Sequence, residues 1–255
     1  GAVAHGFLGI KGVRVVILYP SKKVSELQEK QLTTLGQNIT ALEVDGDFDQ
    51  CQALVKKAFL DDELNQDLNL TSANSINIAR WLPQAIYYAW MSLQRADAKQ
   101  IPVAVPSGNY GNLTAGLLAK KMGFPLGHFI ACSNANDVIP RYLMSAQFEP
   151  MDTIPTYANA MDVSRPSNFS RLLELYDHSY DKIASDISGF SMSNVDIIQT
   201  IHESYQNDSY LLDPHSAIAY AALKEMFDRE QIGVFLATAH PVKFIPVMKK
   251  AINSM

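Results

Sequence analysis

The stretch Pro106-Ser107-Gly108-Asn109-Tyr110-Gly111-Asn112-Leu113-Thr114 has the pattern of a strand that turns sharply into a helix. The apolar residues 101–105 before it predict a buried strand, and residues 113–122 predict a helix that ends at Gly123. A strand and a helix joined by a short loop form half of a βαβ unit, and such units build parallel sheets. The sequence therefore predicts an α/β fold around this loop.

The same alternation of strand and helix patterns occurs near both ends of the chain. Strands are predicted at 13–19 and 39–44, and the helix between them begins with the capping box Ser25-Glu26-Leu27-Gln28. Towards the other end, Asp213-Pro214 is typical of a helix start, and a strand pattern at 233–237 follows that helix. We expect open, mostly parallel sheets with helices on both faces.

The composition of the chain changes at about residue 75. Residues 61–69 are polar, whereas residues 82–94 form an aromatic and aliphatic helix pattern. A change of this kind is typical of a passage between domains. We predict a smaller α/β subdomain over 1–75 and a larger α/β domain over 76–255.

Composition excludes several classes of protein. The 255 residues carry a formal net charge of −5, which argues against a nucleic-acid binder because such proteins usually show a basic stripe. No apolar run approaches the ~20 residues that a membrane-spanning helix needs. The two cysteines, Cys51 and Cys132, form no Cys-x-x-Cys motif, which excludes a disulfide framework and fits the reducing cytosol.

The loop over residues 108–112 is the most informative local feature. Its glycines let the backbone approach a ligand closely, and the N-terminus of the following helix attracts an anion such as a phosphate. The loop has neither the Walker lysine nor the Gly-x-Gly-x-x-Gly spacing, which disfavours nucleoside triphosphates and dinucleotides. A simple tight turn remains the alternative.

Two further segments could bind ligands. Asn74-Ser75-Ile76-Asn77 lies near Arg80, whose guanidinium suits a second phosphate or a carboxylate, although a helix cap beside a surface arginine explains the same residues. Pro83 fits the first position of the following helix, which would leave Arg80 in a loop. Thr238-Ala239-His240-Pro241 follows a predicted strand, where ligands of α/β proteins bind; a turn is the alternative.

Other sites are not indicated. The six histidines show no metal-binding spacing, so we predict no metal site. The Gly-x-Ser-x-Gly elbow of serine hydrolases is absent. The run 108–111 matches the Gly-x-x-Gly of a KH module in form only, without its fold pattern or positive charge.

Several segments in the same order together resemble the threonine synthases, which are fold-type-II pyridoxal-phosphate (PLP) enzymes, and their bacterial form most closely. The shorter matches are Ala2-Val3-Ala4-His5 and Leu27-Gln28-Glu29-Lys30. The longer matches are Ser72-Ala-Asn-Ser-Ile-Asn-Ile-Ala-Arg80, Pro106-Ser-Gly-Asn-Tyr-Gly-Asn-Leu-Thr-Ala-Gly-Leu-Leu-Ala-Lys120, Asn159-Ala-Met-Asp-Val-Ser-Arg-Pro166 and Thr238-Ala-His-Pro-Val-Lys-Phe244.

The resemblance implies roles for individual residues. The family's Gly/Asn loop holds the cofactor phosphate, and its Thr-Ala-His-Pro threonine, here Thr238, faces the pyridine nitrogen. The family's Asn-Ser-x-Asn…Arg segment binds the substrate phosphate, which implies that role for Ser75 and Arg80, and Asn109 is implied for both phosphates. The implied cofactor-binding loop residues are Gly108, Asn109, Tyr110, Gly111 and Asn112.

The implied reaction is the last step of threonine biosynthesis. O-phospho-L-homoserine loses phosphate by γ-elimination, and water then adds at Cβ to give L-threonine. The PLP ring serves as the electron sink, while the protein binds two phosphates and directs the proton transfers.

One departure from the family concerns catalysis. The family's Schiff-base lysine lies upstream of a Thr-Ser-Gly-Asp-Thr-Gly motif, and neither is present here; Lys243 is not in that context. The chain also begins at Gly1 without a methionine. We therefore expect that the N-terminal region with the catalytic lysine is missing, that 1–75 is a partial subdomain, and that this chain alone is inactive.

Two alternatives remain open. One is another fold-type-II PLP lyase, of the threonine dehydratase or cysteine synthase type. The other is a non-catalytic domain that binds a phosphorylated ligand. Activity on phosphohomoserine against serine or threonine separates the enzymes, and the presence of the lysine motif separates an enzyme from a binding domain.

Overall fold

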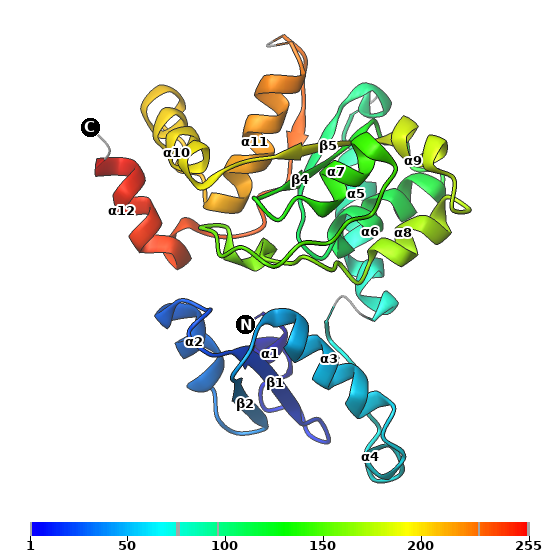
Figure 1. Cartoon of the computed structure of the whole chain (residues 1–255), viewed down its shortest axis with the longest axis vertical. Helices are drawn as coiled ribbons and strands as arrows, with labels where there is room; N and C mark the ends of the chain where they lie inside the picture. Colours follow the sequence, from blue (N-terminus) through cyan, green and yellow to red (C-terminus); the bar gives the residue numbers. More distant parts are fainter. Residues whose placement is uncertain (1, 75–76, 96, 229, 254–255) are drawn as a thin grey trace. The chain divides into compact units, whose positions relative to one another are not determined.

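The protein is described by a computed structural model that covers residues 2–74, 77–95, 97–228 and 230–253 (Figure 1). The chain folds into two compact units, Gly1–Ala73 and Asn74–Met255. The sequence placed the division at residue 75, which lies outside the described residues. Every site residue discussed below belongs to the larger unit.

The smaller unit is built on a pair of parallel strands, as the alternating pattern predicted. β1 (Val15–Pro20) pairs in parallel with β2 (Ile39–Val44). Ser25 closes a capping box with Gln28 at the start of the helix between them, which confirms that sequence signal. The helices of this unit are α1 (Ala2–Phe7), α2 (Glu26–Thr33), α3 (Phe48–Phe59) and α4 (Asp62–Asp67).

The larger unit contains a parallel sheet with the strand order β5-β4-β3-β6 in its described residues. The central strands are buried on both faces, which explains their continuous apolar sequence. The strands are β3 (Val103–Pro106), β4 (Phe129–Ser133), β5 (Ile187–Ser191) and β6 (Val234–Phe235).

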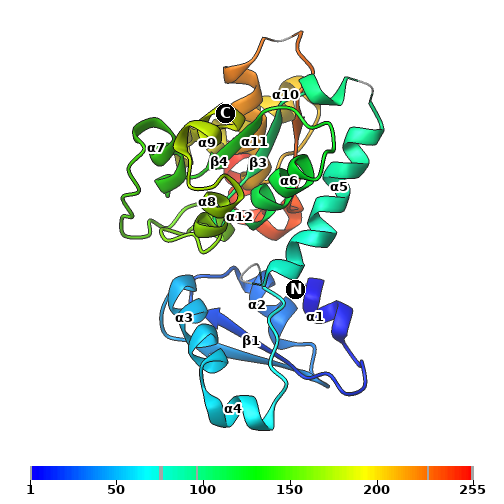
Figure 2. The same ribbon diagram turned by 90° about the vertical axis from the view of Figure 1, so that its right-hand side faces the viewer.

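Helices cover both faces of this sheet, as predicted. Val103 and Val105 pack into one buried cluster with residues of α5, α6, α7 and α8, whereas Ala104 packs into another with α10, α11 and α12. Figure 1 shows the two groups of helices on opposite sides, and Figure 2 shows α5 alongside α6. These helices are α5 (Trp81–Leu93), α6 (Gly111–Lys121), α7 (Val138–Ser145), α8 (Phe169–Leu175), α9 (Tyr180–Asp186), α10 (Asn194–Asp208), α11 (Pro214–Met226) and α12 (Ile245–Asn253).

Two details of the helix starts differ from the sequence prediction. Pro83 is the third residue of α5 and not its first, which the helix tolerates because the first turn needs no backbone donor there. Arg80 therefore ends a 3₁₀ turn, Ile78–Arg80, and does not lie in an open loop. The sequence also did not predict α7, α9 or β5, which are short segments of five to eight residues.

The helices α6 and α11 begin at the same edge of the sheet. α6 follows the carboxyl end of β3 directly, so its N-terminus lies at the carboxyl edge of the strands. α11 leads into β6, and a Cβ on Gly233, just before that strand, would touch Leu223 near the end of α11. α11 thus runs antiparallel to β6, and its N-terminus also lies at the carboxyl edge.

Candidate functional site

The loop between β3 and α6 carries a strained residue. Tyr110 is the N-cap of α6 and has a left-handed backbone with φ of 61°. Such a conformation costs a residue with a Cβ about 1–2 kcal/mol. The Tyr110 ring is buried, and its hydroxyl shares a short hydrogen bond with Ser133 at the end of β4. The hydrogen bond to Ser133 holds the turn in place. Burial raises the pKa of the Tyr110 phenol.

The N-terminus of α6 has no side-chain cap. The backbone N of Thr114 donates the first hydrogen bond of the helix, to the Tyr110 carbonyl at 3.0 Å. The N–H groups of Gly111, Asn112 and Leu113 therefore precede the helical ladder and lie at the positive end of the helix dipole. An uncapped helix start at the carboxyl edge of a parallel sheet suits a phosphate group.

Gly108 lies against another segment of the same edge. A Cβ on this residue would come within 2.5 Å of the Met161 Cα, in the 3₁₀ helix Asn159–Met161. Glycine at this position thus allows two backbones to meet. The sequence predicted that glycine here allows approach to a ligand; the fold adds a packing requirement that the sequence alone did not reveal.

The asparagine side chains of the loop are engaged within the fold. Asn109 Oδ1 accepts from the backbone N and the Oγ of Ser167, at 2.6 and 2.9 Å. Asn112 Oδ1 accepts from the hydroxyls of Tyr87 and Tyr88, both at 2.8 Å. These bonds engage the Oδ1 acceptors of both asparagines and fix the loop to α5 and to the segment before α8.

Arg80 lies beside this loop. Its Nε atom is buried and has no hydrogen-bond partner among the described residues. Its charge lowers the pKa of Tyr87, although burial of that phenol is the larger effect and raises it overall. Because the Tyr87 hydroxyl bonds Asn112, the Arg80 guanidinium is near the start of α6. Ser75, its predicted companion, lies outside the described residues.

Asn168 connects the start of α5 with the loop, and no sequence motif pointed to it. Its Nδ2 donates to the Asn109 carbonyl at 2.9 Å, and its Oδ1 accepts from Trp81 Nε1 at 3.2 Å. Arg171 donates to the same oxygen at 2.9 Å. Asn168 is fully buried, two residues after the run 159–166 that resembled the family.

Thr238 lies at the same sheet edge, in an exposed loop after β6. β3 pairs with β6 so that Ala104 lies opposite Phe235, and Leu236 N donates to the Ala104 carbonyl at 3.1 Å. Continued by three residues, this register brings Thr238 level with Ser107. The predicted cofactor-binding segments 108–112 and 238 therefore follow adjacent strands.

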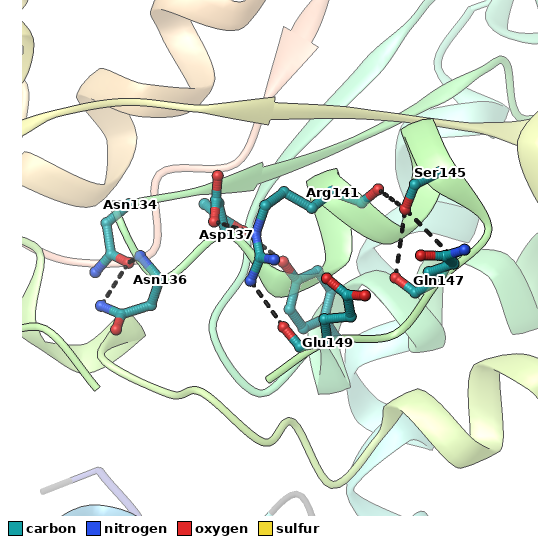
Figure 3. Close-up of polar contacts among 9 residues, drawn as sticks. Asn134, Asn136, Asp137, Arg141, Ser145, Gln147 and Glu149 are labelled. Atoms are coloured by element: carbon teal, nitrogen blue, oxygen red, sulfur yellow. Dashed lines mark hydrogen bonds and ion pairs between the residues drawn. The ribbon is translucent and has the colours of Figure 1, made fainter. Parts of the chain in front are cut away.

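The segment after β4 adds a partly buried polar cluster, of which Figure 3 shows Asn134 and Asn136. Asn134 and Asn136 donate to Asp162 Oδ1 at 2.8 and 3.2 Å, and Thr156 donates to both Asp162 oxygens. Burial raises the pKa of Asp162 above its ordinary value despite these donors. Figure 3 also shows Arg141 joining Asp137 to the Glu149 carbonyl, at 2.9 Å each, which ties down the neighbouring loop.

A second buried carboxylate caps α11. Asp213 Oδ1 accepts from the backbone N of His215 at 2.9 Å and lies 2.9 Å from His215 Nδ1, while Ser216 donates to its other oxygen. Burial favours the neutral acid, but the bonds and charge of His215 outweigh it and lower the pKa of Asp213. The sequence predicted Asp213 only as a helix cap, a role the structure confirms.

No metal site or membrane helix emerges from the part of the chain that the structure describes. Its histidine, cysteine and acidic residues form no cluster able to hold a metal ion, and none of its helices is long and apolar enough to span a bilayer. Cys51 and Cys132 are buried free thiols.

A protein-family model matches residues 3–235, and it describes pyridoxal-phosphate-dependent enzymes. The chain belongs to this PLP-dependent enzyme family. Membership agrees with the observed parallel sheet and with the loop over residues 108–112 at its carboxyl edge, whose geometry suits a phosphate. The PLP-dependent family and the α/β fold that the sequence motifs predicted are thus confirmed.

Curated relatives narrow the likeness within the PLP family. The chain is 50% identical over 245 residues to threonine synthase of Serratia marcescens, covering 95% of this chain and 57% of that protein. It is 48% identical over 245 residues to threonine synthase of Escherichia coli, with the same coverage. The chain therefore spans just under three fifths of the length of these relatives.

Solved structures agree with this likeness. The crystal structure of threonine synthase from Escherichia coli matches with a TM-score of 0.92 and 46% identity, over 98% of this chain and 59% of that one. PLP-bound threonine synthase from Brucella melitensis matches with a TM-score of 0.86 and 35% identity, over 98% and 60%. Serine racemase from maize, at 14% identity and a TM-score of 0.66, shares the fold alone.

Proposed function

We propose that this chain forms the cofactor-phosphate and substrate-phosphate binding region of a threonine synthase. The whole protein would convert O-phospho-L-homoserine and water into L-threonine and phosphate. The observation that carries this proposal is the uncapped N-terminus of α6 beside Arg80, whose buried Nε has no partner among the described residues. Two anion-binding features at one sheet edge suit a phosphorylated cofactor together with a phosphorylated substrate.

The residues present fit the phosphate of PLP. Gly108 allows the loop to pack directly on the backbone of Met161. The backbone N–H groups of Gly111 and Asn112 lie at the positive end of the α6 dipole, where they can donate to an anion. Tyr110, anchored on Ser133, holds this turn in its strained conformation. Bound PLP would supply an electron sink that favours loss of a proton from the carbon that bears the substrate amino group. We assign the loop Gly108, Asn109, Tyr110, Gly111 and Asn112 to its phosphate.

Arg80 is the proposed ligand of the substrate phosphate. A guanidinium offers paired donors that match phosphate oxygens, and its buried Nε would gain the partner that the fold does not provide. We assign Ser75 and Asn109 to the same group, as the family resemblance implies. The bond from Asn168 to the Asn109 carbonyl positions this part of the loop.

Thr238 is the proposed partner of the pyridine nitrogen. A neutral hydroxyl favours pyridine protonation less than a carboxylate would, so it moderates electron withdrawal. The register of β3 with β6 supports this assignment, since it brings Thr238 level with the start of the 108–112 loop. We propose the cytoplasm as the site of action, where buried Cys51 and Cys132 stay reduced.

Binding and turnover together test this function. Calorimetric titration of the chain with PLP and with inorganic phosphate should show binding that Gly108→Ala weakens at least tenfold. The complete polypeptide should release threonine and phosphate from O-phospho-L-homoserine. Formation of a 2-oxo acid from serine or threonine, without phosphate release, would instead indicate a dehydratase. Binding of phosphate without turnover of either kind would indicate a binding domain.

A further inference from the structure

His215 is a buried imidazole with an unused nitrogen. The residue is 3% exposed, and its Nε2 has no hydrogen-bond partner among the described residues. Its other nitrogen, Nδ1, lies 2.9 Å from Asp213 Oδ1. An orphaned polar atom inside a protein is costly, so a native structure that keeps one calls for an explanation.

The position of His215 places it at the proposed cofactor site. It stands in the first turn of α11, whose N-terminus lies at the carboxyl edge of the sheet. Its ring centroid is 5.0 Å from that of Phe244, the last residue of the run that begins at Thr238. On another side its charge acts on Asp162, which follows the Met161 that packs on Gly108. His215 thus lies between Phe244, in the run that begins at Thr238, and Asp162, in the segment that packs on the 108–112 loop.

The first turn of α11 is not itself an anion site. Asp213 accepts from the backbone N–H groups of His215 and Ser216, at 2.9 and 3.4 Å, so its carboxylate occupies the place an anion would take. The ligand-directed group at this helix start is therefore the imidazole and not the backbone. The charged partners that act on His215 among the described residues are Asp213 and Asp162.

We propose that His215 contacts the bound cofactor through Nε2, with Asp213 as the residue that positions its ring. The Nδ1–H donates to the Asp213 carboxylate, which fixes the ring orientation and the tautomer. Nε2 then offers a lone pair when the ring is neutral and a donor when it is protonated, so it can pair with a polar atom of PLP in either state. This inference rests on the proposed PLP-dependent function.

Two isosteric variants separate ligand contact from a structural role. Asparagine places an amide nitrogen where Nδ1 lies, and glutamine places one where Nε2 lies. If Nε2 contacts PLP, His215→Gln should keep PLP affinity within about threefold, whereas His215→Asn should weaken it by about tenfold or more, since a bond to a charged ligand is lost. If the ring only supports Asp213, His215→Asn should be the better tolerated variant.

The measurements are calorimetric titration with PLP and the imidazole ¹⁵N spectrum of the chain. Addition of PLP should shift the His215 Nε2 resonance, assigned by its loss in His215→Gln. His128→Gln serves as the control, because His128 bonds Ser188 beside the amino end of β4, away from the carboxyl edge. That variant should change neither PLP affinity nor the His215 resonance.

The outcomes are distinct. Binding of PLP with an unmoved His215 resonance, or with Asn tolerated better than Gln, overturns the His215 contact and leaves the proposed function standing. Failure of the wild-type chain to bind PLP overturns the cofactor site, and the His215 contact falls with it. Thermal unfolding of each variant confirms that affinity is compared between folded proteins.

Discussion

Gly108 and Met161 meet so closely that a Cβ on the glycine would stand 2.5 Å from the Met161 Cα and 3.0 Å from its carbonyl carbon. Both neighbours are backbone atoms, which cannot rotate away as a side chain can. The contact joins the loop over residues 108–112 to the segment that contains Asp162. The loop geometry therefore depends on a residue without a side chain.

Gly108→Ala should consequently displace the loop. We expect a loss of about 1–3 kcal/mol of unfolding free energy from overpacking, and at least tenfold weaker phosphate binding. Urea unfolding and calorimetry measure the two effects. Gly6→Ala is the matched control, because a Cβ on Gly6 meets nothing within 4 Å; it should leave phosphate binding unchanged. Normal phosphate affinity in Gly108→Ala would remove the loop from the proposed site.

Arg80→Lys should weaken binding of O-phospho-L-homoserine by tenfold or more with little change in folding. A lysine keeps the charge but loses the paired donors, including the buried Nε. Equilibrium binding to the complete polypeptide measures this effect. Arg95→Lys, at an exposed ion pair with Asp97, provides the control and should bind normally. Equal affinities for the two variants would return Arg80 to a structural role.

Asn168→Ala should destabilise the larger unit by about 2–3 kcal/mol, because it leaves Trp81 Nε1 and the Asn109 carbonyl without their buried partner. Chemical unfolding, followed by tryptophan fluorescence, measures the loss. Ser170→Ala, at an exposed position in α8, is expected to cost less than about 0.5 kcal/mol. A similar small cost for Asn168→Ala would mean that water satisfies these groups.

Asp186 should make stability depend on acid pH. Burial alone would raise its pKa, but the hydrogen bonds from Lys120 and Tyr176, at 2.8 and 2.9 Å, outweigh burial and lower it. The unfolded state then binds the proton more readily, so this contribution is complete above the ordinary pKa of 3.8 and is lost as pH falls through the lowered value.

Asp186→Asn should therefore flatten the decline in unfolding free energy between pH 5 and pH 2 (roughly the window in which a paired carboxylate titrates). Urea unfolding across this range measures it. Asp181 is exposed on the same helix, α9. Asp181→Asn should therefore show the same decline in unfolding free energy as the wild-type chain. An identical acid profile for Asp186→Asn would contradict the assigned ion pair.

Local sequence patterns predicted those parts of the fold that local forces form. The β-branched run at 39–44 predicted a strand, and Ser25 with Gln28 predicted a capping box; the structure contains both. The strand at 187–191 escaped prediction, because its Ser-Gly-Phe-Ser sequence has no strand pattern and depends on pairing with β4. Tertiary pairing here overrides local propensity.

The sequence by itself determined the α/β class and the parallel strands. It also predicted the strand-to-helix loop at 108–112, which we propose as an anion site, since glycines and a helix start act locally. Only the tertiary structure decided that Met161 lies on Gly108, that Asn168 joins Trp81 to Asn109, and that His215 is buried with an unpartnered nitrogen. These contacts join segments distant along the chain. Which side chain is left without a partner depends on how every neighbouring segment packs, and no local pattern encodes that.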